Sequence, residues 1–310
     1  MRVLFWGTPA FATPALRALL GEGSDVVGVV TQPDKPVGRS RSRVQPSAVK
    51  EVAVAEGLPV LQPERPRGAE FVAQIRALSP DLSVVVAYGH ILPLDVLEQP
   101  PRGTLNIHAS LLPLLRGAAP IQAAIREGHT KTGVTIMRMV LRLDAGPIIL
   151  QLPTDIAEDE TGGELGLRLS ELGAGALIEA LALLEMGQAP AQAQDDARAT
   201  YASKISREST RIDWTQDATI ISRAVRAYDP RPAAWSTLEA RDVKLFGARP
   251  EPLSISATPG EVLTAGADGL LIACGSGALR VLHAQPAGQK RLLAADWVRG
   301  RGVGVGKRFA

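Results

Sequence analysis

Residues 82–108 read LSVVVAYGHILPLDVLEQPPRGTLNIH. Two continuous apolar stretches, 82–88 and 104–108, flank a short segment with helical spacing at 92–99. Apolar strands connected through a helix are typical of a parallel sheet that is covered on both faces. The sequence therefore predicts an α/β fold built on a Rossmann-like, mostly parallel sheet with helices on both faces.

The same alternation of strands and helices extends over the first 188 residues. The expected strands are 2–7, 25–32 and 58–62, followed later by two strands within 132–152. The expected helices are 11–23, 46–57 with Ser47 as its N-cap, 69–78, 117–128, and one long or two short helices at 164–187.

The character of the sequence changes after residue 188. Residues 189–205 are polar and rich in Ala and Gln, without clear periodicity, which predicts a linker. From 206 onward, a helical segment at 218–228 precedes short strands separated by Gly, Pro and Asp. Such strands are typical of a small antiparallel barrel. We therefore expect residues 1–188 and 206–310 to form two domains, the second being a smaller, OB-like β-barrel.

The composition excludes several classes of protein. Of the 310 residues, 45% are hydrophobic and 21% are charged, as in ordinary soluble globular proteins. We find no N-terminal signal pattern, and no apolar run reaches the ~20 residues of a membrane-spanning helix. A single cysteine, Cys274, excludes an internal disulfide and a Cys-rich metal site, and its apolar surroundings predict a buried, inert thiol. We expect a cytoplasmic protein with no membrane partner and no metal, and nothing in the sequence demands more than a monomer.

Charge is distributed unevenly along the chain. Residues 1–205 contain 19 Lys and Arg against 22 Asp and Glu, whereas residues 206–310 contain 15 against 10, so the second part suits an anionic partner. The first part has one basic segment, DKPVGRSRSRVQP (34–46), in which small residues lie between Lys35, Arg39, Arg41 and Arg43. Guanidinium groups spaced in this way suit phosphates, although a solvated basic loop has the same composition.

Three polar residues occur where the surroundings are otherwise apolar. Asn106 and His108 are two positions apart in an expected strand, so their side chains share one face of the sheet. Asp144 lies in a turn at the end of another apolar strand. An amide can donate to an oxygen that gains negative charge, an imidazole can transfer protons near neutral pH, and a carboxylate can orient the imidazole. Together the three suit acyl transfer to an amine, whereas each one alone is compatible with an ordinary structural role.

Other catalytic motifs are missing from the sequence. No Ser or Cys lies in a nucleophile elbow, and there is no HExxH or CxxC motif. Gly7-Thr8-Pro9 follows the first strand, but neither a GxGxxG motif nor a P-loop is present. These three residues therefore indicate a sharp strand-to-helix turn and no nucleotide site.

The chain contains Asn-x-His-x-Ser-Leu-Leu-Pro at 106–113, followed by RGAAPIQ at 116–122 and Leu-Asp-x-Gly at 143–146. With these motifs it resembles the folate-dependent formyltransferases, and among them the group that formylates methionyl-tRNA. Further similar segments are FWGTPAFATPAL (5–16), VVTQPDKPVGR (29–39), VVVAYGHILP (84–93), TGVTIMRM (132–139), TYASKISRESTRIDW (200–214) and QPAGQK (285–290). This resemblance covers nearly the whole chain. It implies transfer of a formyl group from 10-formyltetrahydrofolate to the amino group of initiator methionyl-tRNA.

The resemblance also implies roles for individual residues. Asn106 would hydrogen-bond the formyl oxygen, His108 would move protons near the reacting carbon, and Asp144 would orient His108 and lie near the folate ring. The implied folate-binding residues are Ser110, Leu111, Leu112, Pro113, Tyr88, Gly89, Ile91 and Leu92, with the stretch 140–143 as a further wall of the pterin pocket. The basic segment would enter the acceptor end of the tRNA, with Arg39 at the matching position and Lys35, Arg41 and Arg43 beside it. The barrel-like second domain is similar to oligonucleotide-binding folds.

Two positions depart from the family pattern. Leu114-Leu115 stands where an Arg-Trp pair is common, and Arg142 stands where Gly is common. Arg142 could face a folate glutamate, the tRNA or solvent. Two other functions stay open at this point: a different folate-dependent formyltransferase or a formyl-folate hydrolase, and a catalytically inactive RNA-binding relative. The basic segment and the second domain favour the tRNA enzyme over the first alternative, and the presence of Asn106, His108 and Asp144 together favours it over the second.

Overall fold

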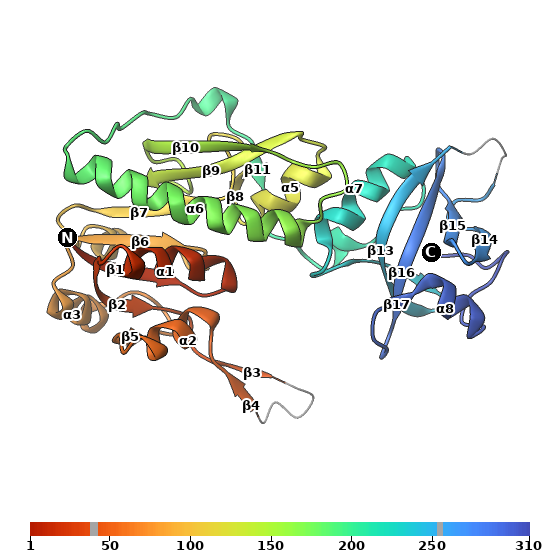
Figure 1. Ribbon diagram of the computed structural model, residues 1–310, viewed down its shortest axis with the longest axis horizontal. Helices are drawn as coiled ribbons and strands as arrows, with labels where there is room; N and C mark the ends of the chain where they lie inside the picture. The colour runs from red at the N-terminus through yellow and green to blue at the C-terminus, as the bar shows by residue number, and fades with distance from the viewer. Residues whose placement is uncertain (38–42, 253–256) are drawn as a thin grey trace. The chain divides into compact units, whose positions relative to one another are not determined.

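A computed structural model describes residues 1–37, 43–252 and 257–310, which divide into two compact units (Figure 1). The first unit comprises Met1–Pro120, Thr132–Asp155 and Gly166–Ala202. The second comprises Ile121–Lys131, Ile156–Leu165 and Ser203–Ala310. The segment that looked like a linker therefore lies within the first unit as far as Ala202, because its backbone and side chains hydrogen-bond to that unit, as described below.

The described part of the first unit contains a seven-stranded sheet. Its strand order is β10 (Ile148–Asp155), β9 (Lys131–Arg138), β7 (Thr104–His108), β6 (Leu82–Val86), β1 (Arg2–Gly7), β2 (Asp25–Val30) and β5 (Val60–Leu61). The strands from β7 to β5 are parallel to one another, and β9 is antiparallel to β7. The predicted mostly parallel sheet is thus confirmed. Its parallel strands end along one edge, which is where ligands bind in open α/β sheets.

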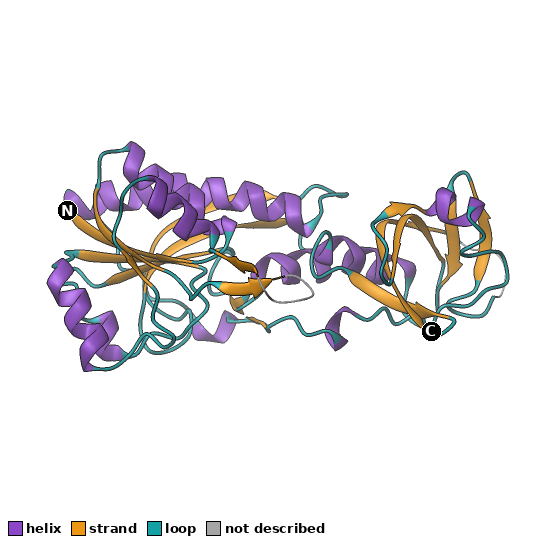
Figure 2. Ribbon diagram, turned by 90° about the horizontal axis from the view of Figure 1, so that it is seen from below, coloured by secondary structure: helices purple, strands orange, loops and turns teal. Residues whose placement is uncertain are grey.

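Helices cover both faces of this sheet, as Figure 2 shows. Their bounds are α1 (Thr13–Gly21), α2 (Ala48–Ala55), α3 (Ala69–Leu78), α4 (Leu94–Leu97) and α6 (Gly162–Glu185), which belongs to this unit from Gly166 onward. Helices α3 and α4 contribute to a core cluster with Trp6, Val85 and Tyr88. Helix α6 is one continuous helix and lies over the opposite face, where a Cβ atom on Gly173 would lie 2.9 Å from the Ile107 side chain.

Several short elements were not predicted from the sequence. Strands β3 (Lys35–Val37) and β4 (Arg43–Gln45) form a hairpin, and β8 (Arg116–Gly117) pairs in parallel with β11 (Tyr201–Ala202). The 3₁₀ turns are η1 (Ala10–Ala12), η2 (Asp196–Arg198) and η3 (Glu208–Thr210). Two or three residues carry no readable periodicity, and their structure depends on distant partners. The N-cap of α2 is as predicted, because the Ser47 hydroxyl accepts a hydrogen bond from the Lys50 amide.

Within the described residues, the second unit contains an antiparallel sheet, α5 (Pro120–Arg126) from Ile121 onward and the start of α6. The elements of Ser203–Ala310 after η3 are α7 (Ala218–Tyr228), β12 (Ala234–Leu238), β13 (Arg241–Glu251), β14 (Val262–Gly266), β15 (Gly269–Ala273), β16 (Ala278–Pro286), β17 (Leu292–Leu293) and α8 (Ala294–Arg299). Residues 306–310 hydrogen-bond to Gly260 and Val262 on one side and to Thr237 on the other. These bonds join the two ends of the strand order β12-β13-β16-β15-β14 and close the sheet into a barrel, as predicted. Cys274 is buried.

None of the helices in the described part of the chain combines the length and the hydrophobicity that a membrane span requires.

Candidate active site

Strand β7 places the two central polar side chains on one face of the sheet. Ile107 lies against α6, so Asn106 and His108, which alternate with it, point to the face that carries α3 and α4. Both are nearly buried, with exposed fractions of 9% and 5%. Two polar groups at these depths need partners or a ligand, because burying an unpaired polar group is costly.

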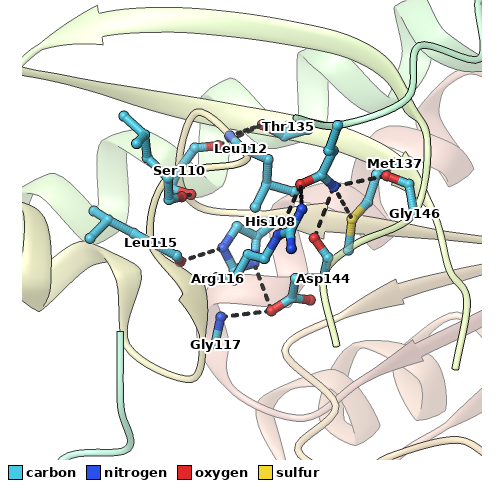
Figure 3. Close-up of polar contacts among 12 residues, drawn as sticks. His108, Ser110, Leu112, Leu115, Arg116, Gly117, Thr135, Met137, Asp144 and Gly146 are labelled. Atoms are coloured by element: carbon cyan, nitrogen blue, oxygen red, sulfur yellow. Dashed lines mark hydrogen bonds and ion pairs between the residues drawn. The ribbon is translucent and has the colours of Figure 1, made fainter. Parts of the chain in front are cut away.

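His108 is held between a backbone carbonyl and a carboxylate (Figure 3). Its Nε2 atom lies 2.9 Å from the carbonyl oxygen of Leu115, and its Nδ1 atom lies 3.7 Å from Oδ2 of Asp144. Because a carbonyl oxygen can only accept, the first contact places a proton on Nε2. Nδ1 is therefore the nitrogen that faces the Asp144 carboxylate. The predicted convergence of Asp144 and His108 is present in the structure.

The Asp144 side chain is fixed by the strand that follows the SLLP motif. Its Oδ2 atom accepts a hydrogen bond of 2.8 Å from the backbone amide of Gly117. The backbone of Asp144 has φ +47, a left-handed conformation that is uncommon for residues other than glycine. Such a conformation persists only where the surroundings enforce it, and residues of this kind cluster at functional sites.

Leu115 has a similar conformation, with φ +59, although it is buried and apolar. Its amide donates to Oγ1 of Thr200, while its carbonyl accepts from His108. The left-handed turn therefore aims the Leu115 carbonyl at the imidazole. This position departs from the family pattern in sequence, but its contribution here comes from the backbone.

Asn106 differs from the other two members of the trio. Within the described residues, its side-chain amide has no hydrogen-bond partner, so its N–H groups are available to a ligand. A cavity of about 500 Å³ opens on the same face of β7, since Thr104, two residues upstream, contributes to its wall. The residues that line it are Leu94, Leu97, Glu98, Pro100, Pro101, Gly103, Thr104, Arg138, Met139, Val140 and Leu141. The stretch 140–143, expected to form part of the pterin pocket, thus contributes Val140 and Leu141 to a real cavity.

The SLLP segment forms a tight loop directly after β7. The Ser110 hydroxyl donates to the Leu114 carbonyl at 2.6 Å, and the Leu112 side chain packs with Met137 and Ile148. Thr135 holds the loop from the opposite strand, because its hydroxyl donates to the Ser110 carbonyl and accepts from the Leu112 amide. Leu111 and Pro113 belong to the same loop. These contacts fix the backbone of the implied folate-binding segment.

The implied folate-binding residues within 88–92 differ in their burial. The Tyr88 ring is buried edge-on against Trp6, and burial raises the pKa of its hydroxyl to about 12. Its side chain therefore belongs to the core, and its carbonyl accepts hydrogen bonds from the side chains of Thr8 and Gln32. Leu92 is also buried in this cluster, whereas Ile91 is 81% exposed. Gly89 has φ +89, which a residue with a Cβ atom adopts only with strain.

The structure brings in residues that the sequence did not indicate. The buried guanidinium of Arg116 donates two hydrogen bonds to Oε1 of Gln194, at 3.0 and 2.7 Å. Nε2 of Gln194 in turn donates to the carbonyl oxygens of Asp144 and Gly146, at 2.9 and 2.8 Å. Gln194 comes from the segment expected to be a linker. No feature of that polar, Ala/Gln-rich stretch distinguishes this glutamine from its neighbours, so only the fold could identify it.

Arg142 pairs with Asp196, which also forms an ion pair of 2.9 Å with Arg116. The hydrogen bonds from Arg142 and then from Arg116 lower the pKa of the Asp196 carboxyl to about 2. Arg142 nevertheless remains 60% exposed. Arg142 therefore pairs with Asp196 of this chain, and the ion pair joins the loop that carries Asp144 to η2.

Two of the four expected tRNA-binding residues belong to the β3–β4 hairpin. Lys35 is exposed at the start of β3, and Arg43 begins β4. Arg39 and Arg41 lie outside the described residues. No group of three or more His, Cys, Asp or Glu side chains in the described ranges is arranged to hold a metal ion.

The root of this hairpin is anchored by a half-buried polar network. The Lys50 ammonium donates to Asp34 at 2.6 Å and to Gln62 at 2.8 Å, and the Gln62 amide donates to Asp34 at 2.7 Å. The hydrogen bond from Lys50, followed by that from Gln62, lowers the pKa of the Asp34 carboxyl. Gln32 extends the network, because its side-chain amide donates to the Tyr88 carbonyl at 2.9 Å.

Comparison with known proteins agrees with this geometry. The family model described as "Formyl transferase" matches residues 1–181, and the model "Formyl transferase, C-terminal domain" matches residues 204–302. The methionyl-tRNA formyltransferase of Magnetococcus marinus is 48% identical over 99% of this chain and 98% of its own length. That of Methylococcus capsulatus is 47% identical over 100% of this chain and 99% of its own length. The chain belongs to the methionyl-tRNA formyltransferase family.

Solved structures share the fold of this methionyl-tRNA formyltransferase family member at lower sequence identity. HypX from Aquifex aeolicus in complex with tetrahydrofolic acid superposes with a TM-score of 0.66 at 23% identity, over 96% of this chain and 47% of that longer protein. The sugar 3N-formyl transferase WlaRD superposes with a TM-score of 0.67 at 17% identity, over 94% and 99% of the two chains. These likenesses concern the fold alone.

Proposed function

We propose that this protein transfers the formyl group of 10-formyltetrahydrofolate to the α-amino group of initiator methionyl-tRNA. One observation carries the proposal. The Asn106 amide, which has no partner within the described residues, lies on the same face of β7 as His108, which pairs with Asp144, and as Thr104, which lines a cavity of about 500 Å³. The chain that holds this arrangement is similar from end to end to proteins named methionyl-tRNA formyltransferase.

The reaction requires three contributions from the protein: a hydrogen bond to the formyl oxygen, proton transfer, and stabilisation of the imidazole that transfers the proton. Asn106 donates a hydrogen bond to the formyl oxygen, which gains negative charge when the amine attacks the formyl carbon. His108 accepts the proton that the amine loses, and a proton passes to the folate nitrogen when its bond to the formyl carbon breaks. Asp144 and the Leu115 carbonyl stabilise the imidazole while it is cationic.

The formyl donor is expected on the face of β7 that carries Asn106 and His108, between the cavity at the start of this strand and the loop that follows it. Its pterin ring suits the cavity walled by Thr104, Met139 and Val140. The loop from Ser110 to Pro113 and the backbone of 88–92 would contact the rest of the ring system. The neighbouring structure of HypX contains tetrahydrofolic acid, which supports this assignment. We propose no metal in the reaction.

Contact with the tRNA is proposed for two regions. Lys35, Arg39, Arg41 and Arg43 of the basic segment 34–46 would bind phosphates near the acceptor end, and the basic second unit would bind further along the backbone. Replacing Arg39, Arg41 and Arg43 together by alanine should raise the KM for tRNA and flatten its dependence on salt. Unchanged tRNA kinetics would exclude the hairpin from binding.

This assignment gives each domain a task. We propose that residues 1–188 bind the folate and carry out catalysis, and that residues 206–310 bind the tRNA. We further propose that the enzyme acts as a monomer in the cytoplasm, where charged initiator tRNA is made.

The deciding experiment is a formylation assay with charged and uncharged initiator tRNA, each with the formyl donor supplied or omitted. We expect formylmethionyl-tRNA only when charged tRNA and donor are both present. Release of formate and tetrahydrofolate without tRNA would indicate a hydrolase. Binding of tRNA without release of tetrahydrofolate would indicate an inactive RNA-binding protein, and formylation of a sugar amine alone would indicate a different transferase.

A further inference from the structure

The turn that carries Asp144 needs support from outside itself. Asp144 has a left-handed backbone, and its neighbours Leu141 and Leu143 are more than half exposed. Apolar packing therefore contributes little to the position of this turn. Its polar contacts must hold it instead, and two of them come from one side chain in the segment after α6.

We propose that Gln194 is a positioning residue for Asp144, an inference that rests on the proposed function. Its amide nitrogen donates to the carbonyl oxygens on both sides of the turn, those of Asp144 and Gly146. A side chain that binds residues 144 and 146 together fixes the backbone between them, and with it the direction of the Asp144 carboxylate.

The orientation of the Gln194 amide is determined by its surroundings. Arg116 offers only donors, so the atom of Gln194 that faces it must be the oxygen. The nitrogen is then directed at the two carbonyl groups, which can only accept. Arg116 is 1% exposed, so its guanidinium cannot turn to solvent and leave the glutamine free to rotate.

The same strand secures the other side of Asp144. Gly117 follows Arg116 in β8, and its amide donates to the Asp144 carboxylate at 2.8 Å. Arg116 and Gly117 are paired with Tyr201 and Ala202 of β11. The segment 194–202 therefore supports the carboxylate through β8 and the backbone of the turn through Gln194.

The Gln194→Glu variant tests this role selectively. Glutamate keeps the length of the side chain and an oxygen for Arg116, but it replaces the N–H donors by an acceptor opposite two carbonyl groups. The contacts to the Asp144 turn are lost, together with a weak contact of 3.9 Å from the amide nitrogen to Sδ of Met137. We expect kcat to fall about 10- to 100-fold, with a much smaller change in the KM for either substrate, because small displacements of a catalytic group have effects of this size. Gln192→Ala is the matched control, since Gln192 lies two residues away and is exposed.

A double-mutant cycle separates positioning from general structural support. If Gln194 acts through Asp144, Gln194→Glu should lower kcat by less than about threefold in an Asp144→Asn background, because residues that act as a unit are not additive. An equal loss in both backgrounds, or no loss in the wild-type background, would overturn the proposal.

Hydrogen exchange at the Gly117 amide gives a readout that does not depend on activity. This amide is bonded to the Asp144 carboxylate, so its protection reports the position of that carboxylate. We expect faster exchange in Gln194→Glu than in the wild type and in Gln192→Ala. Equal protection in all three would overturn the proposal. If the wild type fails to formylate methionyl-tRNA, the proposed function fails, while the exchange result still decides whether Gln194 holds the turn.

Discussion

Replacing Asn106 should lower the rate of catalysis strongly while changing the stability of the fold very little. Its amide has no partner within the described residues, so Asn106→Ala breaks no hydrogen bond there, and we expect the free energy of unfolding to change by less than about 1 kcal/mol. Loss of one donor to a developing oxyanion, in contrast, should lower kcat by ~10²–10³, or about 2.7–4 kcal/mol of transition-state stabilisation. Asn106→Asp should be at least as slow, because its carboxylate would repel the oxygen that gains negative charge.

The assay combines single-turnover formylation at saturating donor and tRNA with urea unfolding of the same preparations. Ser83→Ala supplies the inverse control, since it removes the buried partner of the Trp6 indole N–H. That variant should lose about 1–3 kcal/mol of stability and keep its turnover. Near-normal turnover in a well-folded Asn106→Ala protein would refute the role of Asn106. A large loss of stability in that variant would refute the inference that its amide is unpartnered.

Three further predictions follow from particular contacts. In Gly146→Ala the new Cβ atom would collide with the carbonyl of Arg138, so activity assays should show at least a tenfold loss, on the order of what a misplaced catalytic group costs. Gly175 lies in the interior of α6, where a Cβ atom meets nothing, so Gly175→Ala should instead raise the free energy of unfolding by about 0.5–1 kcal/mol. The pKa of Asp196 is lowered to about 2 in the folded protein. Its carboxylate therefore contributes stability above its unfolded pKa of about 4, and this contribution is lost as the pH falls through 2. The difference in Tm between the wild type and Asp196→Asn should shrink as the pH falls from about 4 to about 2. Tyr88→Phe removes a buried hydroxyl that has no partner among the described residues, so thermal melting should show an unchanged or slightly higher stability, and the KM for the formyl donor should stay the same.

The sequence predicted the fold well where the elements are long. Continuous apolar strands such as 82–86 and the helical spacing at 164–185 record burial directly, because every residue of the element contributes to the pattern. The alternation along β7 also predicted that Asn106 and His108 share a face. The hairpin β3–β4 and the pair β8–β11 escaped prediction, since each depends on partners and not on a periodic pattern.

The sequence by itself determined the mostly parallel sheet, the barrel and the chemical types of the catalytic trio. Only the tertiary structure decided how that trio is held. His108 is oriented by a carbonyl seven residues away, and Asp144 by the Gly117 amide and the Gln194 side chain, which lie 27 and 50 positions from it. Contacts of backbone atoms and single amides leave no mark on composition or periodicity, whereas burial of a whole strand does, because it constrains each side chain along the strand.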